Sequence, residues 1–157
     1  MLEESKESTH TNHIVIVFKK IHSEIEKKLE KKNIKLISLE LSKDIYILNK
    51  ISLIKKIIKE NEIDLVNTWL YKTDFYVGII CFLIGFKNII WNVRCTDTSN
   101  HTNLIQKILV ITLAQLSKII PKKIIFNSYQ SIKDHTKKGY DINKFHLIHN
   151  GFDIKDN

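Results

Sequence analysis

Side chains that could take part in chemistry gather at four places in an otherwise apolar chain. Each place follows an apolar segment with a strand-like pattern, and together they hold Trp69, Tyr71, Lys72, Asp74, Arg94, Ser128, Asn150 and Gly151. In an open sheet of parallel strands, ligands bind beyond the carboxyl ends of the strands. We therefore expect these residues to line one binding site at that edge of a sheet.

Arg94 is the best single candidate, because it is the one arginine among 25 basic residues. A guanidinium can contact a phosphate or a carboxylate through two parallel hydrogen bonds, which a lysine cannot do. In a chain so rich in lysine, an arginine at a strand end favours a functional contact. The alternative is an ion pair with Asp97 or Asp74.

The other polar residues also have plain structural interpretations. Asp74 and Ser128 are credible N-caps of helices, and Asn150 with Gly151 is a common turn pair. For any one loop taken alone, capping and turn formation is the stronger interpretation. Four polar loops that converge on one edge favour a site.

Histidines and cysteines indicate neither a metal site nor a nucleophile. His10 and His13 have a ligand-like spacing, but His10 lies in a polar tail. We expect His135 on a helix surface. Cys81 and Cys95 are expected to be reduced thiols. No metal and no cofactor is predicted, and the catalytic base is not identified.

The elements that must position these residues alternate along the chain. The patterns predict strands at 13–18, 34–41, 63–68, 88–93, 123–127 and 145–149, and helices at 23–32, 47–61, 74–84, 104–119 and 129–138. Strand–helix alternation with continuous apolar strands is typical of a parallel sheet covered by helices on both faces. The predicted fold class is therefore α/β and Rossmann-like.

Composition fits one globular domain. The chain has 157 residues, 43% of them hydrophobic, and a formal net charge of +8 that is concentrated after residue 100. The polar N-terminus does not resemble a signal peptide, and the longest apolar run, 75–86, is too short to span a membrane. We expect a cytoplasmic protein, with possible peripheral contact at the inner face of the membrane.

Six short motifs, in order, resemble the acceptor-side domain of a GT-B glycosyltransferase of the family-4-like group. They lie at Thr68–Asp74, Ile90–Arg94, Leu116–Pro121, Asn127–Ser128, His135–Tyr140 and His149–Asp153. The resemblance implies transfer of a sugar from a nucleotide-sugar donor to the hydroxyl of a glycan or lipid-linked acceptor, without a metal. It also implies that Trp69 and Tyr71 stack on a sugar, although packing under a neighbouring loop is equally compatible. Asn150 and Gly151 would let backbone approach the donor diphosphate.

The chain departs from the family pattern at both ends. Compared with the family pattern, we expect the first strand and its Gly-rich loop to be missing, together with the donor-binding domain. We therefore expect a polar tail at 1–12, a glycosyltransferase N-terminal-like domain at 13–153 and the start of a linker at 154–157. The isolated chain should be inactive without a separate donor domain. Lys72 stands where the family pattern leads us to expect a histidine.

The missing first strand also predicts how the sheet is built. It would normally lie between the strands at 13–18 and 63–68, so we expect a gap or a substituted pairing between them. The alternative is that these two strands pair directly in a shortened domain.

Two other function classes are alternatives to the transferase. One is a non-catalytic Rossmann-like module that binds an anionic ligand or a partner domain. The other is a nucleic-acid binder, suggested by the basic final third. The second is disfavoured because no basic stripe with interleaved aromatic residues is present.

Overall fold

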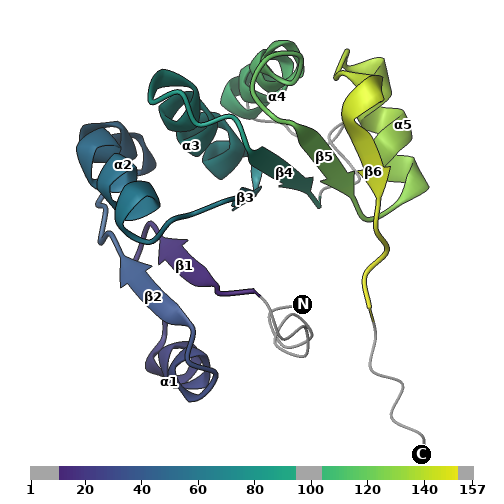
Figure 1. Ribbon diagram of the computed structural model, residues 1–157. Coiled ribbons are helices and arrows are strands. Elements are labelled where there is room, and N and C mark those ends of the chain that lie inside the picture. The colour runs from purple at the N-terminus through teal and green to yellow at the C-terminus, as the bar shows by residue number, and fades with distance from the viewer. Residues whose placement is uncertain (1–10, 95–103, 152–157) are drawn as a thin grey trace, which may run out of the picture. The chain divides into compact units, whose positions relative to one another are not determined.

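The computed structural model describes residues 11–94 and 104–151, and the chain divides into two compact units, Met1–Ile47 and Leu48–Asn157 (Figure 1). Several sequence-based expectations fall outside the described residues. These are most of the tail at 1–12, the segment 154–157, Cys95, the closing Asp153 and the ion pair of Arg94 with Asp97.

The first unit is a strand–helix–strand motif. Strand β1 (Ile14–Val17) and strand β2 (Lys35–Ser38) pair in parallel, with Ile14 opposite Lys35 and Val17 opposite Ser38. Helix α1 (Ser23–Lys31) connects them and buries Leu29. Acidic residues in its first turn and lysines in its last turn complement the helix dipole.

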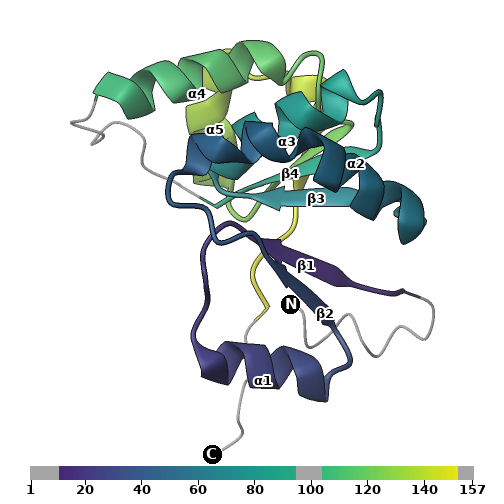
Figure 2. The ribbon, with the colours of Figure 1, turned by 90° about the vertical axis from the view of Figure 1, so that its left-hand side faces the viewer.

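The second unit contains a four-stranded parallel sheet in the order β3-β4-β5-β6. The strands are β3 (Val66–Trp69), β4 (Ile89–Val93), β5 (Lys123–Phe126) and β6 (Phe145–Leu147). The helices are α2 (Ile51–Glu60), α3 (Tyr71–Leu83), α4 (Leu104–Leu116) and α5 (Tyr129–Lys137). Short 3-10 helices, η2 (Asp44–Lys50) and η3 (Ile142–Lys144), precede α2 and β6. Figures 1 and 2 show α3, α4 and α5 along one face of this sheet.

The core of this unit lies between that sheet face and those helices. Its largest buried side chains include Trp91, Phe126 and Leu113. Gly78 lets α3 approach the sheet closely, because a Cβ there would lie 3.3 Å from Ile120 Cγ2 and 3.4 Å from Trp91 Cζ2. Burial of such large apolar groups is the main favourable contribution to folding.

A small polar network fixes the end of α4. The buried Ser117 hydroxyl donates to the Ala114 carbonyl at 2.7 Å and accepts the Asp141 N–H at 2.9 Å. Lys144 Nζ donates to the carbonyls of Ser117 and Lys118, at 2.9 and 2.8 Å. These bonds satisfy carbonyls that the helix end leaves without an intrahelical partner. They also join α4 to the segment that leads into β6.

The predicted class, a Rossmann-like α/β fold with parallel strands flanked by helices, is confirmed. Each predicted strand and helix overlaps an observed one. In the part of the chain that the structure describes, β1 pairs with β2 in one sheet and β3 pairs with β4 in another. Because β1 and β3 belong to different units, the gap between them and the alternative of direct pairing both stay predictions. Among the described helices, none has the length and apolar content needed to cross a membrane.

Candidate functional site

The site begins at a sharp turn between β3 and α3. Leu70 lies between the last residue of β3 and the first of α3, with φ +77° and ψ 144°. A residue with a Cβ is strained in this region, and such strain often accompanies functional sites. Because β3 ends at Trp69 and α3 begins at Tyr71, the segment predicted to be a loop is largely strand and helix. Asp74 is therefore not the N-cap that the sequence suggested, since it lies inside the first turn of α3.

Arg94, Trp69 and Asn150 form the centre of the candidate site. The guanidinium carbon of Arg94 lies 4.5 Å from the centroid of the Trp69 ring, a cation–π contact. Arg94 Nη1 also donates a hydrogen bond to Asn150 Oδ1. Because these residues follow or end β4, β3 and β6, they lie together at the carboxyl edge of the sheet. A stacked, hydrogen-bonded arginine is held in one orientation, which suits the binding of an anion.

Three further predicted residues lie at or near the same edge with different roles. Ser128 caps α5, because its side chain accepts the Ser131 N–H at 3.2 Å, and this confirms the predicted cap. Gly151 is exposed at the end of the described chain, and Lys72 is exposed on the first turn of α3. The roles predicted for Lys72 and Gly151 stay predictions.

The structure adds polar residues that were not among the predicted site residues. Asn92 Nδ2 donates to Asn67 Oδ1, which joins β4 to β3 on the same face as Trp69. Asn127 directly follows β5, and its side-chain oxygen is buried without a hydrogen-bond partner among the described residues. The exposed Tyr129 packs edge-on against His149, with centroids 5.9 Å apart. The position of these residues at or just past strand ends was the sequence pattern that could have identified them.

Tyr71 and Asp74, which were also predicted for this site, instead belong to a buried polar cluster beneath it. The Thr68 hydroxyl donates to Asp74 Oδ1 at 2.5 Å. Asp74 Oδ2 is buried without a partner among the described residues. Burial raises the pKa of Asp74 well above its ordinary value, and the Thr68 hydrogen bond opposes this only in part. Burial thus favours the neutral form of the Asp74 carboxyl group.

His135 is the centre of this cluster, and the prediction that it lies on a helix surface is wrong. It is fully buried on α5, where its ring packs against Phe126 and Tyr140. Its Nδ1 lies 2.7 Å from the Ser131 carbonyl oxygen, which can only accept, so Nδ1 carries the proton. Its Nε2 therefore accepts the hydrogen bond from the Tyr71 hydroxyl, also at 2.7 Å.

The protonation state of His135 follows from this geometry. Burial is the main cause that lowers its pKa from 6.5 to about 4, against the opposing effect of the Ser131 hydrogen bond. A protonated ring could no longer accept the bond from Tyr71. The neutral imidazole thus fixes Tyr71, at the start of α3, to α5. The same cluster supports the turn that presents Trp69.

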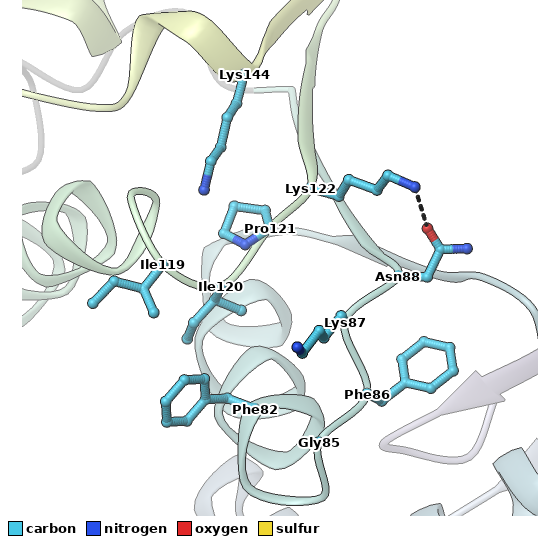
Figure 3. A pocket seen from close by; sticks show the side chains of 10 residues that line it. All are labelled: Phe82, Gly85, Phe86, Lys87, Asn88, Ile119, Ile120, Pro121, Lys122 and Lys144. Atoms are coloured by element: carbon cyan, nitrogen blue, oxygen red, sulfur yellow. Dashed lines mark hydrogen bonds between the residues drawn. The ribbon is translucent and has the colours of Figure 1, made fainter.

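A separate hollow of about 590 Å³ lies at the opposite edge of the sheet (Figure 3). Its floor is apolar, with Phe82, Phe86, Ile119, Ile120 and Pro121. Lys87, Lys122 and Lys144 surround it, and the Lys122 amine donates to Asn88 Oδ1 at 3.4 Å. Because Asn88 and Lys122 precede β4 and β5, this hollow is distinct from the Arg94 site. The described residues contain no group of three or more His, Cys, Asp or Glu side chains placed to hold a metal ion.

Comparison with known proteins supports the fold and goes no further. No family model matches the chain. No curated protein matches it either. Among solved structures, it is similar to the crystal structure of Anabaena Alr3699/HepE in complex with UDP and glucose, with a TM-score of 0.67 and 19% sequence identity. The similarity covers 90% of this chain and 37% of that one.

Proposed function

We propose that this chain is the acceptor-side domain of a GT-B glycosyltransferase that transfers a sugar from a nucleotide-sugar donor to an acceptor hydroxyl. The observation that carries the proposal is the group formed by Arg94, Trp69 and Asn150 at the carboxyl edge of the sheet. The similarity of fold to a protein solved with UDP and glucose supports it. The family-4-like motifs of the sequence agree with it.

The chemistry of the site suits a sugar with an anionic group. Trp69 is 38% exposed, so part of its ring is available to an apolar sugar face. A guanidinium binds phosphate or carboxylate with fixed geometry. Enzymes that transfer groups between bound molecules rely on such positioning and on fixed charges that stabilise the leaving group. In the proposed enzyme, the nucleotide part of the donor is held mainly by a separate domain, and no metal or cofactor is required.

The two tryptophans provide a direct test, because Trp91 is fully buried and Trp69 is partly exposed. Titration with glucose 6-phosphate should change the fluorescence of Trp69 in a saturable manner, whereas neutral glucose should have a much smaller effect. Arg94→Lys keeps the charge but loses the bidentate geometry, so it should weaken binding by roughly tenfold or more. The melting temperature of the Arg94→Lys variant should remain close to that of the wild type. The Trp69→Phe variant should show no fluorescence change on titration.

A second measurement separates the transferase from a non-catalytic anion-binding module. The 157-residue chain incubated with UDP-glucose should release no UDP above a heat-treated control, whereas the same chain supplemented with a donor domain should do so. Equal binding by Arg94→Lys would contradict the proposed site. Binding without release in the supplemented enzyme would favour the non-catalytic module.

A further inference from the structure

We propose that the hollow at the amino edge of the sheet binds a small organic anion with an aromatic body, such as an aromatic carboxylate. This inference goes beyond the proposed function, because the hollow includes neither Arg94 nor Trp69 and lies at the opposite end of the strands. It starts from the composition of the lining, in which lysine side chains surround an apolar floor.

The hollow has the size and the apolar floor of a small-molecule site. Its volume of about 590 Å³ lies within the range of roughly 300–1,000 Å³ that is usual for ligand pockets. Phe82 is 58% exposed and Ile119 is 65% exposed, so each presents a large apolar surface to water. Phe86 and Pro121 line the hollow beside them. An aromatic ring placed on this floor would remove apolar surface from water and would pack against a phenylalanine ring.

Backbone hydrogen bonds fix the walls of the hollow. Where α3 ends, Gly85 adopts φ +76°, which turns the chain back toward β4. The Phe86 N–H closes this turn by donating to the Cys81 carbonyl at 2.8 Å. The Lys122 N–H donates to the Ile89 carbonyl, also at 2.8 Å, and joins the segment before β5 to the start of β4. A hollow with fixed walls loses little free energy in ordering when a ligand binds.

The charges around the floor favour an anion. The described residues that line the hollow include Lys87, Lys122 and Lys144 and no acidic side chain. The Lys144 amine is already bonded to two backbone carbonyls, so it contributes positive charge from a fixed position. The Lys122 amine makes a long hydrogen bond of 3.4 Å to Asn88 Oδ1, which a carboxylate can replace by a shorter, charge-assisted one.

Lys87 is placed to hold the charged group of a ligand whose ring lies on the floor. In the view of Figure 3, the Lys87 side chain lies between Phe82 and Phe86. A lysine amine carries three donors on a flexible stem, so it can reach an anionic group at the edge of an aromatic ring. The floor and the lysines thus match the two parts of an aromatic anion.

The test uses anilinonaphthalene sulfonate, an aromatic anion whose fluorescence rises in apolar surroundings, and its neutral analogue phenylnaphthylamine. The wild-type chain should bind the anionic probe with a Kd of roughly tens to hundreds of micromolar. Raising the ionic strength to about 1 M, where charges are screened within about 3 Å, should weaken binding of the anionic probe severalfold and leave the neutral one unaffected.

Matched variants locate the probe. Phe82→Ser should weaken binding of the anionic probe by roughly tenfold, because the ring supplies apolar floor. Leu83→Ser is the control, since Leu83 is the next residue of α3 and is 62% exposed but does not line the hollow. Lys87→Gln and Lys122→Gln should each weaken binding of the anionic probe by about threefold and leave the neutral probe unchanged. Lys107→Gln, at an exposed lysine of α4 outside the hollow, should change neither.

Circular dichroism of each variant checks that the fold is retained. Equal losses in Phe82→Ser and Leu83→Ser, or unchanged binding of the anionic probe in both Lys87→Gln and Lys122→Gln, would overturn the proposal. Competition between the anionic probe and glucose 6-phosphate would place the probe at the Arg94 site and would overturn it as well. A dimer in size-exclusion chromatography that Phe82→Ser separates would overturn it in favour of a second copy of the chain.

Discussion

The buried cluster beneath the site contains two groups whose effects on stability oppose each other as the pH changes. His135 has a lowered pKa in the folded chain, so the unfolded chain binds a proton more readily between pH 6.5 and about 4. Its contribution to stability is complete above pH 6.5 and is lost as the pH falls through that interval. Asp74 has a raised pKa, so its contribution is complete below about pH 3.8 and is lost as the pH rises.

The contribution of His135 to the unfolding free energy follows from the change in its pKa between the unfolded and the folded chain. One pKa unit corresponds to about 1.4 kcal/mol, so a change from 6.5 to about 4 amounts to roughly 3 kcal/mol across the interval. As the pH rises above about 3.8, Asp74 changes the unfolding free energy in the opposite direction, because its pKa is raised in the folded chain. In the wild-type chain the contribution of Asp74 should therefore oppose that of His135.

The Asp74→Asn variant should show the pH dependence of the unfolding free energy that His135 contributes. The asparagine keeps an oxygen that can accept the Thr68 hydroxyl, and it does not titrate. Any constant cost of burying its amide shifts stability equally at every pH. We expect the unfolding free energy of this variant, measured by urea denaturation, to rise by roughly 3 kcal/mol from pH 4 to 6.5. The unfolding free energy of the wild type should rise less over the same interval, because Asp74 opposes the increase.

The reciprocal variant, His135→Gln, tests the contribution of Asp74 alone. His135→Gln removes the histidine, so stability should fall with rising pH above about 3.8 because only Asp74 then titrates within the cluster. Tyr71→Phe is a milder alternative that retains the ring and removes the hydroxyl bonded to His135 Nε2. If the Asp74→Asn variant has the same pH dependence as the wild type, Asp74 is not protonated in the fold and the reasoning fails.

Two further predictions concern single positions. Leu70→Gly should raise the melting temperature, because glycine removes strain of about 1 kcal/mol or more at φ +77°, whereas Leu70→Ala keeps the Cβ and should not. Ser117→Ala should lower the unfolding free energy in urea by about 1–3 kcal/mol, since the Asp141 N–H loses its acceptor. Thr136→Ala, which removes an exposed hydroxyl bonded to a helix carbonyl, is the control and should cost much less. A neutral Ser117→Ala would show that this contact does not anchor α4.

The order of strands and helices could be predicted from the sequence because each element carries its own local pattern. The amphipathic spacing of α2 and the β-branched run of β1 are properties of consecutive residues. Ser128 was likewise predictable as a cap, because a cap acts within one helical turn. The predicted gap depended on the resemblance to a family, since no local pattern reveals which strands pair.

The composition of the site was harder to predict, and the segment 68–74 shows why. Strand alternation directs Thr68 inward and Trp69 toward the opposite face, and the tight turn at Leu70 then starts a helix that buries Asp74. Residues adjacent in sequence are thus divided between the site and the core. The division depends on where strand ends and helix begins, which sequence patterns place only within a few residues.

His135 shows the same limitation, because it was predicted to be exposed and is buried. His135 was expected on a helix surface, but the burial of its side chain follows the helical period of α5. Ser131 and His135 are four residues apart and are both fully buried. A histidine on the inward stripe of an otherwise polar helix was the signal that could have identified it.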